Sequence, residues 1–388
     1  MTETASSKQI RRVLVTGASG FIGGRLCEVM AITGTYTPRA FIHSTASAAR
    51  ITRFPIEFSI GDLRDSASVD RAVEGCDAIV HLARGEGSVM RAGLENLLRA
   101  AVLHKVSRFV HMSTVAVYGN MPPPESITED SPIRHCDNLY GREKLGQEKR
   151  VLKYARNHGL PAVILRPPNV WGPYSHFSLE MIQKISKGTL ALVSNGQNPC
   201  NLVHVDNLVE AILLSLWKPE AVNEVFFVTD DPVISWKQCL EDQAALVNTH
   251  LPGVAEEDLV VPAAERVWRE SFKVVPRVFV SGEFRQQLRR IPLLRIVEEK
   301  LFAGFQSLSA ETQHSLRSRL TGGNTAVLVR PATAPRFVRN GLHFTQMRRV
   351  AHSSEKARRL LGYTAPVKYA EGMANLQAWL RFARHLTS

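Results

Sequence analysis

The sequence lacks the features that mark a metal centre, a membrane span or an exported protein. Its five cysteines are scattered, with no CxxC pair and no histidine-rich partner motif, so we expect reduced packing residues and no bound metal. No stretch approaches the roughly 18 consecutive apolar residues that a membrane-spanning helix needs. The first residues, MTETASSKQIRR, contain no apolar signal core, and we therefore expect a cytoplasmic protein.

Acidic residues are scarce towards the end of the chain, and this scarcity produces the net charge of +12. Residues 251–388 contain 22 lysines and arginines against 11 acids, whereas residues 1–250 contain 26 against 25. Between Glu311 and Glu355 there are seven arginines and no acid. Such a block attracts phosphates, nucleic acid or an anionic membrane surface, or is simply a solvated basic face. Because no nucleic-acid recognition module is visible, we expect no specific nucleic-acid partner.

A chain of 388 residues exceeds one typical domain, and its pattern changes near residue 174. Before that point, buried strands alternate with helices, which predicts an α/β protein with a doubly wound parallel sheet. We assign residues 1–173 to this domain, with residues 200–230 returning to it in part. Residues 174–388 are assigned mainly to a smaller, partly helical substrate domain, with an atypical basic insertion at about 240–345.

Residues 10–24, IRRVLVTGASGFIGG, carry the clearest local signal. A short apolar run predicts a buried strand, three glycines follow at three-residue spacing, and a helical pattern then begins. Gly17 would adopt a conformation that side chains hinder, Gly20 would let the main chain approach a pyrophosphate, and Gly23 would let the helix pack on the strand. The first turn of such a helix attracts phosphates. This order predicts a Rossmann-type crossover that binds a dinucleotide.

The residues after the second predicted strand bear on the choice of cofactor. Proteins that bind NAD usually place a carboxylate there for the ribose 2′-hydroxyl, whereas this chain has His43 and Ser44, with Arg50 nearby. A 2′-phosphate would meet no repulsion, so we expect NADP, with NAD as the alternative. After the third strand, Asp62 could accept a hydrogen bond from an adenine amino group, or could cap the helix that begins near Ser66.

A tyrosine, a lysine and a threonine follow in the order that proton transfer requires. Tyr140 and Lys144 are four residues apart on a predicted helix, so they share one face. A neighbouring ammonium and an oxidised nicotinamide would lower the pKa of the phenol, which could then exchange a proton with a carbinol or carbonyl oxygen. Thr114, at the end of the fifth strand, could add a second hydrogen bond to that oxygen. A Tyr-x-x-x-Lys pair alone is commonly a surface pair; its combination with the glycine turn makes the signal strong.

With these motifs the chain resembles an extended short-chain dehydrogenase/reductase of the NAD-dependent epimerase/dehydratase family. The resemblance covers about residues 10–230. The motifs are TGASGFIG (16–23), GDL (61–63), HLA (81–83), STVAVYG (113–119), YGREK (140–144), RPPNVWGP (166–173), NLVHVDN (201–207) and the ending SSEKARRLLGY (353–363).

The resemblance implies a role for each matched position. Thr114, Tyr140 and Lys144 would be catalytic. Contacts with the cofactor are expected at Gly17, Gly20, Phe21, Ile22, His43, Ser44, Asp62, Leu63, Leu82, Ala83, Arg84, Ser113, Tyr140, Lys144 and Pro167. Contacts with the substrate are expected at Ser113, Tyr140, Asn169 and Val170, with Asn169 facing a diphosphate.

Two positions depart from the family pattern. Arg84 follows HLA where a small residue is common, and Met90 stands where the family usually has an asparagine, after a shorter loop. These departures concern the part of the active site above the tyrosine. The segment at 240–345 is longer than usual and matches nothing in the pattern, so we expect it to influence the choice of substrate.

The function that fits best is an NAD(P)-dependent nucleotide-sugar epimerase or keto-reductase. Dehydration is disfavoured, because Val115 and Ala116 stand where the sugar dehydratases carry a pair of acidic residues. One alternative is a reductase of a hydrophobic, sterol-like or natural-product ketone, with residues 284–302 at a membrane surface. Another is a nucleotide sensor without turnover, which would have no need for both Tyr140 and Lys144. The chain could also form a homodimer.

Overall fold

The computed structural model describes residues 10–85, 87, 89–124, 127–133, 136–260, 337 and 340–386. The chain divides into two compact units, one formed by residues 1–256 with 340–388 and the other by residues 257–339. The basic stretch 284–302 and most of the predicted insertion lie outside the described residues. Of the helices that are described, none has the length and apolarity to cross a bilayer.

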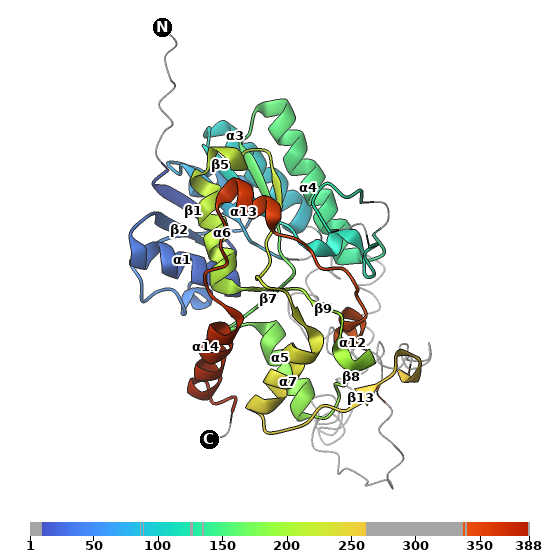
Figure 1. Cartoon of the computed structure of the whole chain (residues 1–388). Helices are drawn as coiled ribbons and strands as arrows, with labels where there is room; N and C mark the ends of the chain where they lie inside the picture. Colours follow the sequence, from blue (N-terminus) through green and yellow to red (C-terminus); the bar gives the residue numbers. More distant parts are fainter. Residues whose placement is uncertain are drawn as a thin grey trace, which may run out of the picture. The chain divides into compact units, whose positions relative to one another are not determined.

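A seven-stranded parallel sheet forms the centre of the first unit (Figure 1). Its strand order is β11-β6-β5-β4-β1-β2-β3, and every neighbouring pair is parallel. The inner strands are apolar runs buried on both faces, as parallel strands covered by helices require. The strands are β1 (Arg12–Thr16), β2 (Thr37–Ile42), β3 (Glu57–Ile60), β4 (Ala78–His81), β5 (Arg108–Met112), β6 (Ala162–Arg166) and β11 (Val225–Phe227).

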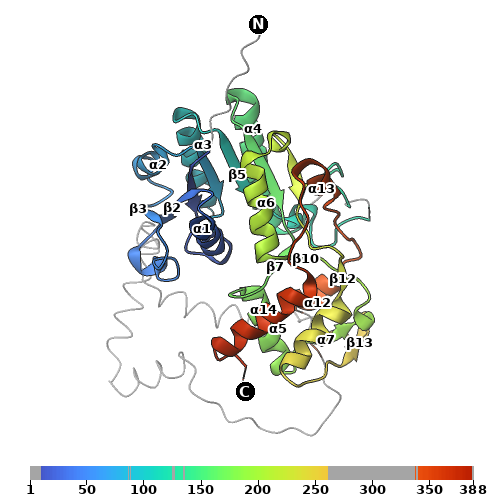
Figure 2. The same ribbon diagram turned by 60° about the vertical axis from the view of Figure 1, so that its left-hand side comes forward.

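Helices cover both faces of this sheet (Figure 2). One face packs against α1 (Phe21–Thr33), α6 (Val205–Trp217) and α13 (Glu355–Leu361). The other packs against α2 (Ser66–Val73), α3 (Leu94–Leu103) and α4 (Leu139–His158). The predicted Rossmann-type, doubly wound α/β fold is therefore confirmed. Short turns of other helix types are η1 (Thr45–Ala48), the π-helical η2 (Val89–Gly93), η3 (Val115–Tyr118) and η5 (Pro219–Ala221).

A second, smaller core lies beyond the carboxyl ends of the strands and is partly helical, as expected. Its helices are α5 (His176–Ser186), α7 (Trp236–Leu246), α12 (Gly341–Gln346) and α14 (Tyr369–Phe382). Its strand pairs are β7 (Asn169–Trp171) with β10 (Leu202–His204), β9 (Pro199–Cys200) with β12 (Ile234–Ser235), and β8 (Leu192–Val193) with β13 (Gly253–Val254); η4 (Ser194–Gly196) follows β8. All five cysteines are buried and free.

The register of the sheet brings the predicted motifs to one edge. Thr16 of β1 pairs with His81 of β4, which pairs in turn with His111 of β5. The glycine turn, the HLA segment and the Ser113–Thr114 segment therefore leave the sheet side by side. The strand order reverses between β1 and β4, and ligands of open α/β sheets bind at such a reversal.

Candidate active site

The glycine turn has the geometry of a phosphate cradle. Gly17 has a φ of +71°, and a Cβ built on it would lie 2.8 Å from the backbone nitrogen of Ala83. Gly20 donates its N–H to the Gly17 carbonyl at 3.0 Å and caps α1 without a side chain. Phe21 and Ile22 begin that helix, so its first N–H groups are left for an anion. The residues present fit a dinucleotide pyrophosphate.

The segment after β4 is fixed to the glycine turn. Leu82 donates its N–H to the Thr16 carbonyl at 3.2 Å, and Ala83 donates to the Thr16 hydroxyl oxygen at 3.4 Å. The Thr16 hydroxyl is also 2.7 Å from the Nδ1 of His81. Burial, with a smaller effect of Lys144, lowers the pKa of His81 to about 3, so its ring is neutral. Leu82 and Ala83 thus lie beside the cradle, as expected.

The segments that contain Thr114 and Tyr140 are brought together by close packing of η3 against the start of α4. Thr114 caps η3, and its hydroxyl oxygen accepts the N–H of Ala116 at 3.2 Å. Asn138 caps α4 by accepting the N–H of Gly141. A Cβ on Gly141 would run into the Ala116 carbonyl, so only glycine allows this approach. Thr114, at the start of η3, is therefore held near the first turn of α4, which contains Tyr140.

Lys144 is buried behind the segments that contain Thr114 and Tyr140 and does not lie on the surface. Its Nζ donates to the Met112 carbonyl at 2.9 Å, and the side chain is 4% exposed. Burial lowers its pKa to about 8; Arg84 adds to this effect, whereas Glu148 and Glu143 oppose it. The ammonium group thus ties α4 to the end of β5.

The electrostatics at Tyr140 differ from those predicted. We expected the ammonium of Lys144 and an oxidised nicotinamide together to lower the pKa of the phenol. In the chain alone, burial raises this pKa, and the cation that opposes the rise is Arg84. The Arg84 guanidinium carbon lies 4.8 Å from the centroid of the Tyr140 ring. Desolvation outweighs the guanidinium because Arg84 itself is exposed to water.

A buried ion-pair network behind the site was missed by the sequence reasoning. Arg166 donates to both carboxylate oxygens of Glu148, at 2.9 and 2.6 Å, and to the Tyr118 hydroxyl at 2.9 Å. Ser113 donates its hydroxyl to the same carboxylate. The proton of the Ser113 hydroxyl is therefore donated to Glu148, so a ligand would have to donate a hydrogen bond to the Ser113 oxygen. Glu148 follows Lys144 by one helical turn, a spacing that could have identified it.

In the loop after β3, where the sequence predicts a contact between Asp62 and the adenine, a second charged residue, Arg64, binds Asp62. Arg64 holds the Asp62 carboxylate through its Nε and its backbone N–H, at 3.0 and 2.8 Å. This hydrogen bonding lowers the pKa of Asp62 to about 2. The alternative role of Asp62 as a helix cap is wrong, because Asp65 caps α2 by accepting the N–H of Ala67. Leu63 is buried beneath Gly93.

No carboxylate occupies the end of β2. His43 and Ser44 follow the strand and are exposed. Arg50 is half-buried: its guanidinium carbon lies 4.0 Å from the centroid of Tyr174 and 3.6 Å from the position of a Cβ built on Gly24 in α1. A cation therefore reaches the beginning of the nucleotide-binding helix.

The predicted substrate segment connects the large sheet to the smaller core. The Pro167 carbonyl accepts the N–H of Val115 at 3.1 Å. Asn169 and Val170 are half-buried in β7, which pairs with β10. Trp171 then donates its ring N–H to Asp230 at 2.7 Å, which anchors the strand. Whether Asn169 and Val170 contact a substrate stays a prediction.

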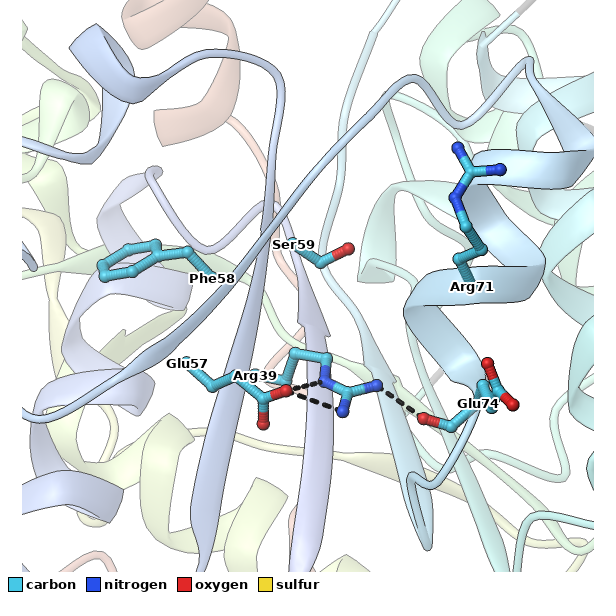
Figure 3. A pocket seen from close by; sticks show the side chains of 6 residues that line it. All are labelled: Arg39, Glu57, Phe58, Ser59, Arg71 and Glu74. Carbon is cyan, nitrogen blue, oxygen red and sulfur yellow. Dashed lines mark hydrogen bonds and ion pairs between the residues drawn. The ribbon is translucent and has the colours of Figure 1, made fainter.

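A hollow of about 390 Å³ lies elsewhere, near the amino ends of β2 and β3 (Figure 3). Within it, Arg39 donates to Glu57 at 2.8 Å and to the backbone carbonyls of Ala72 and Glu74. The Arg39 guanidinium is thus satisfied by groups of the hollow itself, and none of the predicted site residues lines it. The lining residues are Arg39, Glu57, Phe58, Ser59, Arg71 and Glu74.

Known proteins resemble this chain in the region of these motifs. Residues 13–228 match the model of the NAD dependent epimerase/dehydratase family. A UDP-glucose 4-epimerase of Vibrio cholerae is 26% identical, over 63% of this chain and 78% of that protein. A 4-hydroxy-2-methyl-3-oxo-4-farnesyl-3,4-dihydroquinoline-1-oxide ketoreductase of Stigmatella aurantiaca is 28% identical, over 59% and 71%. The structure of the Bacillus cereus UDP-glucuronic acid 4-epimerase with NAD covers 96% of this chain and 99% of its own, with a TM-score of 0.62 and 17% identity.

Proposed function

The chain belongs to the NAD-dependent epimerase/dehydratase family, as the sequence motifs indicated, and within that family we propose that it is a nucleotide-sugar epimerase or keto-reductase. The proposal assigns proton transfer to Tyr140, assisted by Thr114 and Lys144. The observation that supports it best is the packing of Gly141 on Ala116, which holds the first turn of α4, with Tyr140, against η3, which Thr114 caps.

Each of the three residues has a separate task in this proposal. The hydroxyl oxygen of Thr114 already accepts an N–H, which leaves its proton for donation to a carbinol or carbonyl oxygen. Tyr140 exchanges the proton of that same oxygen. Lys144 holds the first turns of α4 against the end of β5. When bound, the nicotinamide supplies the hydride acceptor and donor.

For the cofactor, we propose that NADP binds at least as well as NAD. The absence of a carboxylate at His43 and Ser44 removes repulsion of a 2′-phosphate, and Arg50 supports the proposal by its place near α1. The resemblance to an epimerase solved with NAD supports a nicotinamide dinucleotide but does not distinguish the two. Gly17, Gly20 and the first turn of α1 would hold the pyrophosphate.

Two further activities fit less well. Dehydration has no support at the relevant positions, because Val115 and Ala116 in η3 cannot transfer protons. Reduction of a hydrophobic ketone is the second candidate, and the likeness to a ketoreductase with a farnesyl-bearing substrate favours it. Homodimerisation, contact with an anionic surface and a cytoplasmic location stay predictions.

The test is a screen of UDP-, GDP- and dTDP-hexoses with the full chain and each cofactor. Thermal shift identifies a nucleotide sugar that binds, and proton NMR then identifies its product. We expect a 4-epimer or a reduced sugar to form. Binding of farnesylated quinolines with no response to any nucleotide sugar would instead support the second candidate, and failure of both classes would contradict the assignment.

A further inference from the structure

Arg84 places an additional positive charge at the catalytic tyrosine. Arg84 comes directly after Leu82 and Ala83. The hydrogen bonds of these two residues to Thr16 hold the backbone that precedes Arg84 in place. Its guanidinium carbon lies 4.8 Å from the centroid of the Tyr140 ring. Within the described part of the chain, no carboxylate forms an ion pair with this guanidinium, so no counter-charge offsets its positive charge over the ring.

The other charged groups at this site face Lys144 more than the phenol. Lys144 is tied to the Met112 carbonyl, and Glu148 and Glu143 raise its pKa while burial and Arg84 lower it. The ring of His81 is neutral, and burial keeps the pKa of its neighbour His111 well below its usual value. At Tyr140, burial raises the pKa and Arg84 is the charge that lowers it.

We propose that Arg84 promotes proton transfer by favouring the ionised form of Tyr140, on which its guanidinium is stacked. A cation above an aromatic ring is attracted by the ring electrons, and a phenolate attracts it more strongly than a phenol does. Arg84 acts through the tyrosine and is therefore a positioning residue for the reaction. This inference rests on the proposed role of Tyr140 in proton transfer.

A direct titration of the phenol tests the proposal without requiring turnover. The seven tyrosines are labelled with carbon-13 at Cζ, and Tyr140→Phe identifies the Tyr140 resonance. The titration is recorded on the full chain with saturating NADP⁺. Arg84→Gln removes the charge, whereas Arg84→Lys keeps it. Arg142→Gln is the matched control, since Arg142 is an exposed arginine of the same helix.

We expect Arg84→Gln to raise the titration midpoint of Tyr140 by about half a pH unit, from Coulomb's law for a solvated charge near 5 Å. Arg84→Lys should restore most of this shift, and Arg142→Gln should leave the midpoint unchanged. An Arg84→Gln midpoint equal to that of the unchanged protein would overturn the proposal. So would a rise in KM for a nucleotide sugar with no shift of the midpoint, because Arg84 would then bind substrate. Lack of turnover alone would contradict the proposed function, but the titration midpoint of Tyr140 would still test the role of Arg84.

Discussion

Replacing Glu148 by Gln should destabilise the protein strongly, because it leaves the Arg166 guanidinium buried without its counter-charge. Arg166 is 5% exposed and Glu148 is 2% exposed, so water cannot compensate for the lost carboxylate. Breaking a buried pair by removing one partner typically costs about 3–5 kcal/mol. The amide oxygen of Gln can still accept one hydrogen bond, so we expect a loss near the lower end, about 3 kcal/mol.

The assay is urea unfolding at pH 7, followed by circular dichroism. Glu95→Gln is the matched control. Glu95, like Glu148, accepts a hydrogen bond from a hydroxyl, here that of Tyr154, and faces an arginine, Arg150, at 3.3 Å, but its side chain is 41% exposed. This surface pair should contribute less than about 1 kcal/mol. Equal losses for Glu148→Gln and Glu95→Gln would refute the reasoning, because they would show that the buried charges are not coupled.

Three other substitutions test separate parts of the site. Gly20→Val should abolish dinucleotide binding, since its side chain would occupy the approach of the pyrophosphate; calorimetry on the folded variant that shows unchanged affinity would refute the cradle. Ser44→Asp should shift preference towards NAD, and a tenfold preference for NAD in the unmodified protein, about 1.4 kcal/mol, would show that the end of β2 has been misinterpreted. The pKa of Lys144 falls from 10.5 to about 8 on folding, so the unfolded state binds the extra proton between these values. The free energy of unfolding should therefore rise with pH over this window by up to about 3 kcal/mol relative to Lys144→Met, and parallel pH profiles would show that the lysine is not desolvated.

The fold could be predicted because its signals are local. The apolar runs of β1, β4, β5 and β6 and the glycine turn fix the alternation of strand and helix, and parallel crossovers then leave few topologies. The spacing of Tyr140 and Lys144 likewise placed both on one helix. Whether these residues perform the predicted roles is a matter for the experiments above.

The features that the sequence did not reveal depend on contacts between distant segments. Glu148 meets Arg166 only because α4 lies across β5 and β6, and the sequence shows neither that crossing nor the hydrogen bond from Ser113. The position of Arg84 over the Tyr140 ring likewise joins the loop after β4 to the first turn of α4. The sequence predicted that Asp62 follows the third strand, but the hydrogen bond that it accepts from the Arg64 side chain depends on side-chain geometry.

The most direct measurement is the turnover of Tyr140→Phe on the nucleotide sugar that the screen selects, with cofactor affinity measured in parallel. The aromatic ring remains, so the cofactor should bind as before. The proton acceptor is lost, so kcat should fall by about 100- to 10,000-fold. Turnover close to that of the unmodified protein, at equal cofactor affinity, would contradict the assignment of proton transfer to Tyr140.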